Sequence, residues 1–277
     1  MNCGRTNKMN QDLKSKLREK TLIMGILNVT PDSFSDGGQF NEIESAVSRA
    51  KEMVADGADI IDIGGESTRP GATMVDADEE IRRVVPIIEA VSQVVTVPIS
   101  IDTYKPEVAK RAIQAGAEII NDVWGAKWDH EMAYVAATYQ VPIVLMHNRR
   151  DVSYTNLIDD VINDLKESIR ICQDAGVVEE NIIVDPGIGF AKTYEENMEV
   201  MRNLETIVQL GYPVLLGTSK KSIVAKTLNL PIDERVEGTG ATVCYGVTKG
   251  CSIMRVHNVK EMSRMTKMMD ALVRGSG

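Results

Sequence analysis

The chain has few of the residues that build several common kinds of site. Its 277 residues include four cysteines, three histidines and two tryptophans, and aromatic residues make up only 4% of the chain. The cysteines show no C-x-x-C spacing, which argues against a zinc site or a disulfide framework and predicts buried, inert thiols. No run of 18 apolar residues occurs, so the sequence predicts no membrane-spanning helix.

Positive charge is also scarce overall, and this limits the class of partner. The net charge is −9 at pH 7, which disfavours nucleic acid and anionic membranes as partners. The first 20 residues are polar and lack the apolar stretch of a secretory signal, so we expect a cytoplasmic protein. A local cluster of Lys and Arg in such a chain therefore indicates a specific task.

What the sequence does contain is a regular alternation of apolar and helical segments. Eight segments are short apolar runs of the kind found in buried strands. The predicted strands are residues 22–30, 59–68, 97–103, 118–125, 141–147, 182–185, 212–220 and 251–258. The predicted helices are residues 42–56, 78–94, 106–116, 128–139, 157–175, 195–210, 222–228, 233–249 and 259–274.

Strands that are apolar on both faces and joined by helices form parallel sheets covered on both sides. Eight such units in a chain of this length predict a single-domain α/β protein, a (β/α)8 TIM barrel. A doubly wound open sheet is the alternative, but no G-x-G-x-x-G follows any predicted strand. We therefore expect a polar lead-in over residues 1–20 and one barrel over residues 21–277.

Polar residues gather where the predicted strands end, which is the face that carries the active site in such barrels. The strand ends supply Asn28, Asp62, Asp102, Asn121, Asp122, Met146, His147, Asp185, Ser219, Lys220, Lys221, Arg255 and His257. The loops after the first two strands add Asp32, Phe34, Asp36, Glu66, Thr68 and Arg69. Barrel interiors also hold structural ion pairs, and we assign Asp62 and Asp122 mainly to that role.

The chemistry of this set indicates a ligand with two different parts. Asp102, Asp185 and Asn121 can each pair with adjacent N–H donors on a flat ring. Arg255, His257 and Arg69 supply cationic donors suited to phosphate.

Two further features suit the phosphate part of such a ligand. The N-terminus of the last predicted helix, with Asn258 as the expected cap, adds an anion-binding position. Asn28 and the phosphate oxygens could share a Mg²⁺ ion, which needs few protein ligands. We therefore expect a polar heterocycle that carries phosphate.

At this point the sequence resembles a known family, the dihydropteroate synthases. The segments IMGILNVTPDSFSDGG (23–38) and GADIIDIGGESTRPG (57–71) look like the two signature segments of that family. The stretches SIDTYKPEVA, INDVWG, VDPGIGFAK, GTSKKS and MRVHNV are similar to its later motifs and occur in the same order. The resemblance implies a TIM barrel that joins 6-hydroxymethyl-7,8-dihydropterin diphosphate to p-aminobenzoate. The products would be 7,8-dihydropteroate and diphosphate, in folate biosynthesis.

The same resemblance implies a role for individual residues. The expected pterin-binding residues are Asp102, Asn121, Met146, Asp185, Lys221 and Arg255. The expected diphosphate-binding residues are Asn28, Arg69, Arg255 and His257, with Asn28 as the Mg²⁺ ligand. The expected p-aminobenzoate-binding residues are Phe34, Thr68, Pro70, Phe190, Lys221 and Ser222. The candidate catalytic residues are Asp102, Asp185, Lys221, Arg255 and Asp36. The family further implies a homodimer and competition by sulfonamides.

The residue types fit a mechanism in which diphosphate leaves first. Mg²⁺ and arginines would take up the charge of the leaving group, and the pterin ring would spread the resulting cation. The neutral amine would then attack, which agrees with the absence of a Ser–His–Asp or Cys–His arrangement. We expect loops 30–40 and 66–74 to close over the amine and exclude water.

Three rival functions remain at this point. A methyltetrahydrofolate:corrinoid methyltransferase shares a pterin-binding barrel but does not need the diphosphate residues. A Schiff-base aldolase could use Lys220 or Lys221, although the acidic ring-binding set argues against it. A pterin-binding protein without catalysis would be marked by the loss of Asn28, Arg69 or Arg255, and all three are present.

Overall fold

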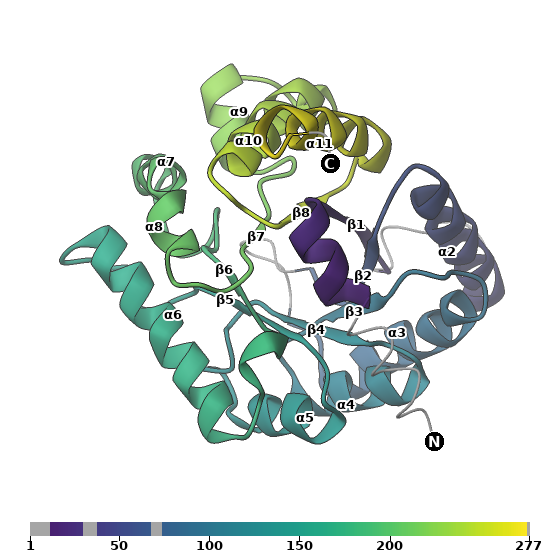
Figure 1. Cartoon of the computed structure of the whole chain (residues 1–277). Coiled ribbons are helices and arrows are strands. Elements are labelled where there is room, and N and C mark those ends of the chain that lie inside the picture. The colour runs from purple at the N-terminus through teal and green to yellow at the C-terminus, as the bar shows by residue number, and fades with distance from the viewer. Residues whose placement is uncertain (1–11, 30–37, 68–73, 276–277) are drawn as a thin grey trace.

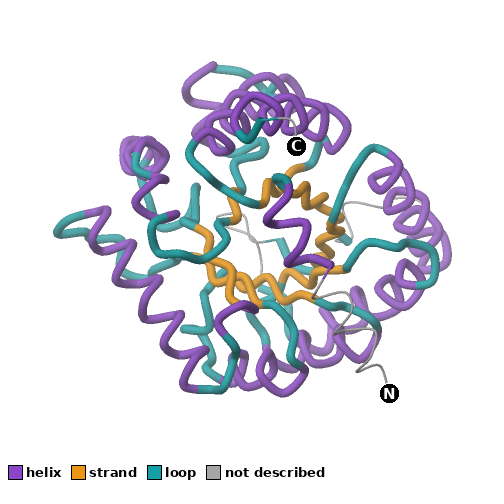
Figure 2. Tube along the Cα trace, in the orientation of Figure 1, coloured by secondary structure: helices purple, strands orange, loops and turns teal. Residues whose placement is uncertain are grey.

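The structure, a computed structural model, describes residues 12–29, 38–67 and 74–275 of the chain. Within these residues eight parallel strands alternate with helices and form a nearly closed barrel. Figure 2 shows the strands as an inner ring and the helices as an outer ring around it. The predicted (β/α)8 TIM barrel is therefore confirmed. The division of the chain at residue 20 stays a prediction.

Each strand is followed by at least one helix. The strands are β1 (Leu22–Asn28), β2 (Ile60–Gly64), β3 (Ile99–Asp102), β4 (Ile119–Asp122), β5 (Ile143–Met146), β6 (Ile182–Asp185), β7 (Leu215–Leu216) and β8 (Ile253–Val256). The helices are α2 (Gly38–Ala55), α3 (Ala77–Ser92), α4 (Pro106–Ala115), α5 (Glu131–Tyr139), α6 (Leu157–Asp174), α7 (Tyr194–Arg202), α8 (Leu204–Val208), α9 (Ser222–Leu228), α10 (Val236–Thr248) and α11 (Val259–Val273).

The order of the strands follows the order of the chain. The hydrogen-bonded order is β6-β5-β4-β3-β2-β1-β8-β7, and every pairing is parallel. A single parallel bridge between Val184 and Val214 joins the two edges of this sheet and closes the ring. Because all carboxyl ends of parallel strands meet at one face, the polar strand-end residues converge there.

Alternate residues of each strand fill the barrel interior in layers. The layer near the amino ends of the strands is apolar and contains Leu22, Met24, Ile60, Ile119, Val144, Ile183, Leu215 and Ile253. Residues 12–19 are helical, and Leu13 of this helix is buried against the same layer. In Figure 1 this helix, in purple, lies across the end of the barrel nearest the viewer. The amino end of the barrel is thus covered, and the polar layer lies at the other end.

The helices form because their apolar residues recur at helical spacing and face the strands. In α3 the buried side chains include Val84, Ile87, Ile88 and Val91, the spacing that places them on one face. Asp76 caps this helix by accepting a hydrogen bond from the backbone N–H of Glu79, with Oδ1 and N 2.8 Å apart.

The structure corrects one predicted helix, one helix start and one predicted helix cap. The predicted helix 195–210 is two helices, α7 and α8, because Asn203 leaves helical geometry and its amide donates to the carbonyl of Glu199 at 2.9 Å. Helix α5 begins at Glu131 rather than at residue 128. Asn258 occupies the N-cap position of α11, but its side chain makes no capping hydrogen bond.

Among the described residues, no helix is both long enough and apolar enough to cross a membrane.

Candidate active site

A buried ion-pair network occupies the carboxyl end of the barrel interior. The guanidinium of Arg255, on β8, donates to Asp62 Oδ2 from Nε at 2.7 Å and to Asp102 Oδ2 from Nη2 at 2.6 Å. The amide of Asn121, on β4, also donates to Asp62 Oδ2, at 3.2 Å. Four strands therefore contribute to one polar layer, and Arg255 connects residues far apart in the sequence. Asp62 acts as the structural partner that we predicted.

Asp102 has one carboxylate oxygen, Oδ1, that takes no part in this network. It is only 6% exposed, and no described residue donates a hydrogen bond to its Oδ1. Burial raises the pKa of Asp102 to about 7, although Arg255 opposes the shift. A buried acceptor without a donor costs free energy, so this oxygen is suited to an N–H donor on a ligand.

Asp185 ends β6 and begins a tight loop, here called the β6 loop, residues 186–191. Its Oδ1 accepts the backbone N–H of Gly187 at 2.7 Å, and its side chain is buried. Burial raises the pKa of Asp185, against the effects of Lys221 and of the Gly187 N–H. Oδ1 of Asp185 thus stabilises the β6 loop through a hydrogen bond, and the carboxylate remains buried at the barrel mouth.

Lys221, which precedes α9, reaches the same region from the opposite side. Its ammonium donates to the carbonyl oxygen of Ile188 at 2.6 Å and lies 4.8 Å from the ring centroid of Phe190. Burial lowers the pKa of Lys221 to about 8, and Asp185 limits the shift. A cation between carboxylates and an aromatic ring can serve two neighbouring subsites.

Apolar side chains form one wall of the barrel mouth. Tyr104, Val123 and Met146 make a small buried cluster, against which Trp124 and Phe190 pack. Met146 is 3% exposed and lies opposite Asp185 in the β5–β6 register. A planar ring bound at the barrel mouth would therefore place one face on Met146 and its edge against polar groups such as the carboxylate of Asp185.

His257 is held by the end of the neighbouring strand. Ser219 Oγ accepts the backbone N–H of His257 at 3.2 Å and lies 2.9 Å from its Nδ1. These two contacts fix the position of the His257 ring beside Ser219.

The comparisons with known proteins agree with this geometry. Residues 24–257 match the family model described as pterin binding enzyme. The dihydropteroate synthase of Bacillus subtilis is 60% identical over 260 residues, which are 94% of this chain and 91% of that protein. The chain belongs to the dihydropteroate synthase family of pterin-binding enzymes.

Solved structures of this family are also similar to the chain. A Clostridium difficile dihydropteroate synthase, studied in the presence of pteroic acid, superposes with a TM-score of 0.90 and is 49% identical; 92% of this chain and 98% of that one are covered. A Xanthomonas albilineans dihydropteroate synthase with 4-aminobenzoic acid gives a TM-score of 0.87 and 38% identity, covering 92% of this chain and 93% of that one.

Some of the candidate site residues named in the sequence analysis lie outside the described residues. These are Asp32, Phe34, Asp36, Thr68, Arg69 and Pro70. Among the described ones, Asn28 ends β1 beside Gly64 of β2 and is partly buried. Ser222 is exposed and is the first residue of α9, directly after Lys221. The structure brings Asp102, Asn121 and Arg255 into one network, and it places Asp185 and Lys221 beside the β6 loop.

Asp122 turns away from the barrel interior. Its two carboxylate oxygens accept the backbone N–H groups of Trp124 at 2.8 Å and Ala126 at 2.7 Å. Burial raises its pKa to about 6, although these N–H groups oppose the shift. Asp122 therefore shapes the loop after β4. The predicted ion pair in the barrel interior is wrong for Asp122, because its side chain lies on the opposite face of β4 from Asn121 and binds backbone N–H groups.

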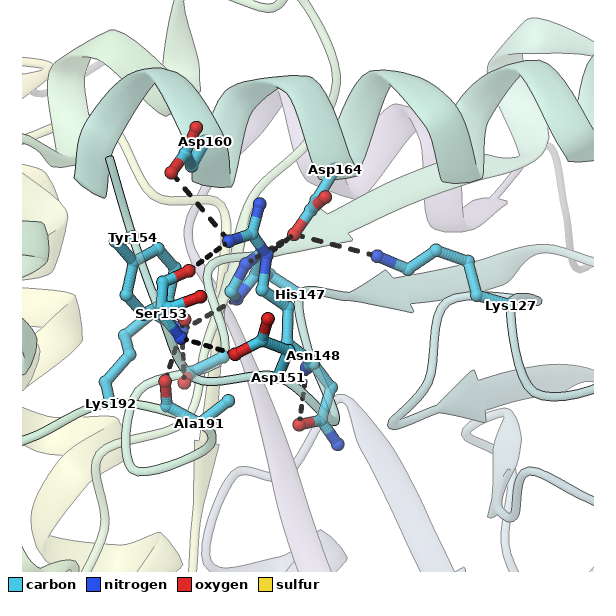
Figure 3. Close-up of polar contacts among 12 residues, drawn as sticks. Lys127, His147, Asn148, Asp151, Ser153, Tyr154, Asp160, Asp164, Ala191 and Lys192 are labelled. Atoms are coloured by element: carbon cyan, nitrogen blue, oxygen red, sulfur yellow. Dashed lines mark hydrogen bonds and ion pairs between the residues drawn. The ribbon is translucent and has the colours of Figure 1, made fainter. Parts of the chain in front are cut away.

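A second polar network lies behind the β6 loop, and the sequence analysis gave its members no function. Lys192 Nζ lies 2.8 Å from His147 Nδ1, and His147 Nε2 lies 3.0 Å from Asp164 Oδ2 (Figure 3). Arg149 also donates to Asp164, from Nε at 2.5 Å. The only sequence signal was the position of His147 at the end of a predicted strand and of Lys192 after the glycines of the loop.

The histidine of this network is neutral in the folded protein. An ammonium group has no acceptor atom, so a protonated Lys192 donates to Nδ1, and the ring proton then sits on Nε2 facing Asp164. Burial lowers the pKa of Lys192 to about 7, although Asp185 opposes the shift. Burial lowers the pKa of His147 to about 4, although Asp164 opposes the shift.

We expect this histidine to make stability depend on acid pH. Between pH 6.5 and 4 the unfolded chain binds a proton at His147 that the folded chain does not, so lowering the pH destabilises the fold. The free energy of unfolding should fall by up to about 2 kcal/mol between pH 6.5 and 5, relative to a His147→Gln variant. Urea unfolding of both proteins at several pH values measures this; a difference that does not change with pH would contradict it.

Proposed function

We propose that the chain condenses 6-hydroxymethyl-7,8-dihydropterin diphosphate with p-aminobenzoate to give 7,8-dihydropteroate and diphosphate. The reaction is a transfer step of folate biosynthesis. The observation that carries the proposal is the buried polar layer at the barrel mouth, in which Asp102 Oδ1 has no donor among the described residues. The membership of the chain in the dihydropteroate synthase family supports the same activity.

The pterin ring is recognised along its N–H edge. Asp102, Asn121 and Asp185 lie at or next to the carboxyl ends of β3, β4 and β6, and all three are buried. A pterin offers adjacent ring and amino N–H donors, which suit carboxylate and amide acceptors at this spacing. Met146 supplies an apolar surface for one face of the ring, and Arg255 covers the other.

The diphosphate group is bound at the β1–β8 side of the barrel mouth. Asn28 ends β1, and Arg255 and His257 lie on and after β8, which pairs with β1. Arg69 completes the proposed set but lies outside the described residues. Arginine donors in a partly dry site stabilise the charge that develops on the leaving diphosphate.

Mg²⁺ is the proposed cofactor, and Asn28 is its proposed ligand. No group of three His, Cys, Asp or Glu side chains in the described part of the chain could hold a metal by itself. An amide oxygen fits Mg²⁺, which keeps several waters and commonly binds through substrate phosphates. When bound, the ion would neutralise diphosphate oxygens and make diphosphate a better leaving group.

We infer that bond breaking precedes bond making. The C–O bond to diphosphate breaks with its electron pair on oxygen, and the pterin ring delocalises the positive charge. The carboxylates of Asp102 and Asp185 stabilise that charge through space. The lone pair of the amine then forms the C–N bond, and the amine loses a proton to solvent or to diphosphate.

The amine substrate is proposed to lie between Phe190, Lys221 and Ser222, with Phe34, Thr68 and Pro70 closing the pocket. Phe190 is partly buried, and its ring lies 4.8 Å from the ammonium of Lys221. Sulfonamides resemble p-aminobenzoate in shape and charge, so we expect them to compete at this position.

A Phe190→Ala variant is expected to have a KM for p-aminobenzoate at least fivefold above wild type, because it removes the ring that faces the amine and leaves the pterin groups in place. Loss of a partly buried ring contact of about 1–2 kcal/mol corresponds to this change. The matched control is Tyr245→Ala, which removes an exposed ring beside Lys249 on α10. Steady-state kinetics measure the KM for each substrate. If the KM for the pterin diphosphate rose as much as the KM for p-aminobenzoate, Phe190 would not be specific to the amine subsite.

The experiment that tests the proposed function measures diphosphate release with the pterin diphosphate and Mg²⁺, with and without p-aminobenzoate. Amine-dependent release with formation of dihydropteroate establishes the activity. Release without the amine supports departure of diphosphate before attack. Tight pterin binding without release would indicate a binding protein instead.

We also propose that the protein is cytoplasmic and forms a homodimer. Helix α11 supports the dimer, because Met262 packs inward whereas Met268 and Leu272 are 58% and 66% exposed and could be covered by a second copy of the chain. Light scattering of the purified protein measures the assembly. A Leu272→Lys variant tests whether the end of α11 contributes to it.

A further inference from the structure

The β6 loop is held between two lysine side chains. On the barrel side, Lys221 Nζ donates to the carbonyl of Ile188 at 2.6 Å. On the opposite side, Lys192 Nζ donates to the carbonyls of Gly187 at 3.1 Å and Phe190 at 3.2 Å. Three carbonyl oxygens in four residues thus accept hydrogen bonds from two lysine side chains.

The backbone of this loop passes through three residues with positive φ, which suits the two glycines but not the alanine. Gly187 and Gly189 have φ of 68° and 87°, and Ala191 has φ of 49°, which is unfavourable for a residue with a side chain. A side chain at position 187 would collide with the carbonyl oxygen of His147. The hydrogen bonds of Lys192 help to maintain this arrangement.

The position of Lys192 is itself fixed by a third hydrogen bond, to His147 Nδ1 at 2.8 Å. His147 in turn contacts Asp164 on α6 through its other ring nitrogen, Nε2, at 3.0 Å (Figure 3). Asp164 also accepts from Arg149, and Lys127 lies 3.9 Å from it. Burial acts against the charge of Asp164, but hydrogen bonds from His147 and Arg149 lower its pKa, so the carboxylate stays ionised.

We propose that Lys192 is a positioning residue for the amine subsite, oriented by His147 and Asp164. It fixes the β6 loop so that the carbonyl of Ile188 holds Lys221 and the ring of Phe190 faces the amine. This inference rests on the proposed function of the site. Lys192 bonds to His147 and to two carbonyls of the loop, so it acts on the amine subsite through the loop.

The proposal predicts an effect on one substrate more than on the other. Asp102, Asn121 and Asp185 lie on strands, which fix their positions, although Asp185 also accepts from the loop residue Gly187. Lys221 is the one proposed pterin-binding residue whose acceptor, the carbonyl of Ile188, belongs to the loop. Pterin affinity should therefore change less than the use of p-aminobenzoate. Phe190 and the acceptor of Lys221 belong to the loop, so use of p-aminobenzoate should weaken. A residue with a purely structural role would lower the amount or thermal stability of active enzyme and leave both KM values unchanged.

A Lys192→Met variant is expected to raise the KM for p-aminobenzoate at least tenfold, with the pterin dissociation constant within threefold of wild type. Steady-state kinetics and calorimetric titration measure the two quantities. The matched control is Lys166→Met on the exposed face of α6, where both values should stay within twofold of wild type.

Two histidine variants make the test independent of the lysine. His147→Gln keeps an acceptor for Lys192 and a donor for Asp164, so its KM for p-aminobenzoate should stay within threefold of wild type. His147→Leu removes both and should behave like Lys192→Met. If Lys192→Met does not fold, the difference between the two His147 variants decides the question. Both His147 variants near wild type, or equal losses of amine and pterin affinity, would overturn the proposal.

Hydrogen exchange separates this proposal from the proposed function. The backbone N–H of Gly189 donates to Asn197 Oδ1 at 2.6 Å, and that of Phe190 donates to Gly187 O at 3.1 Å. Both amides should exchange at least tenfold faster in Lys192→Met than in wild type, whether or not the wild type makes dihydropteroate. A wild type without synthase activity would contradict the proposed function alone, and unchanged exchange would contradict the positioning role alone.

Discussion

An Asp185→Ala variant of this chain is expected to bind the pterin substrate at least a hundredfold more weakly than the wild type. The carboxylate is 5% exposed at the end of β6, where it would accept the paired N–H donors of the ring. Removing one member of a buried, charge-assisted pair costs about 3–5 kcal/mol, and 1.4 kcal/mol corresponds to a tenfold change in affinity. Calorimetric titration with the pterin diphosphate measures the loss.

Alanine also removes the acceptor for the backbone N–H of Gly187, so the variant loses support for the β6 loop. Asp185→Asn separates the two effects. Its amide oxygen can still accept from Gly187, but its NH₂ group would face donors of the ligand, and the negative charge is lost. We expect Asp185→Asn to unfold at nearly the wild-type temperature and still bind pterin at least thirtyfold more weakly.

Asp122→Asn is the matched control for a buried aspartate at a strand end. Asp122 is 1% exposed and accepts two backbone N–H groups, but its side chain lies on the opposite face of β4 from Asn121. We expect this variant to lose stability and to keep wild-type pterin affinity. If Asp185→Asn binds pterin normally, the ring-binding role of β6 is wrong.

The sequence predicted the architecture well because each β/α unit carries its own local pattern. The apolar runs located all eight strands, but every strand except β6 is shorter in the structure than predicted: the run 59–68, for example, contains β2 at Ile60–Gly64. Only the middle of such a run pairs with its neighbours, and the rest forms the loops of the barrel mouth. Periodicity cannot mark that transition, because loop residues such as Gly65 are also buried.

The site was predictable in part for a related reason. The topology of a parallel barrel places every strand end at one face, so Asp102, Asn121 and Asp185 could be assigned to one site without knowledge of their contacts. The network of Lys192, His147 and Asp164 was not predictable. Its members are separated by 17 and 45 residues, and no spacing rule joins the side of α6 to the loop after β6.

The ion pair between Arg255 and Asp62 was not predictable from the sequence either. We assigned Arg255 to substrate binding and Asp62 to structure, and 193 residues separate the two. The two residues come together because β8 and β2 both pair with β1, on its opposite edges. In the structure Arg255 belongs to both roles, because its guanidinium lies between Asp62 and Asp102.

An Arg255→Met variant is therefore expected to lose stability as well as activity. The side chain of Asp62 is fully buried and that of Asp102 is 6% exposed, and the variant would leave both without their cationic partner. Breaking a buried ion pair by removing one partner costs about 3–5 kcal/mol. Methionine keeps the length and much of the volume of the arginine stem, so the loss reports on charge rather than on a cavity. Urea unfolding of both proteins measures it.

The pH dependence of this loss has a definite sign. Burial already raises the pKa of Asp102 to about 7, and without Arg255, which opposes the shift, the pKa should rise further. Above the pKa of an exposed aspartate, near 3.9, the folded variant then holds a proton that the unfolded chain does not. The stability of Arg255→Met should therefore decrease as the pH rises from 5 to 8, and the gap to the wild type should widen.

The double variant Asp62→Asn with Arg255→Met identifies the source of the loss. Neutralising Asp62 removes one of the two carboxylates left without a partner, so the double variant should regain about 1–2 kcal/mol relative to Arg255→Met alone. Activity should not return, because the proposed diphosphate contact of Arg255 is still missing. A loss below about 1 kcal/mol in Arg255→Met at pH 8, with no gain in the double variant, would show that water solvates the two carboxylates. In that case Arg255 would act on the substrate alone.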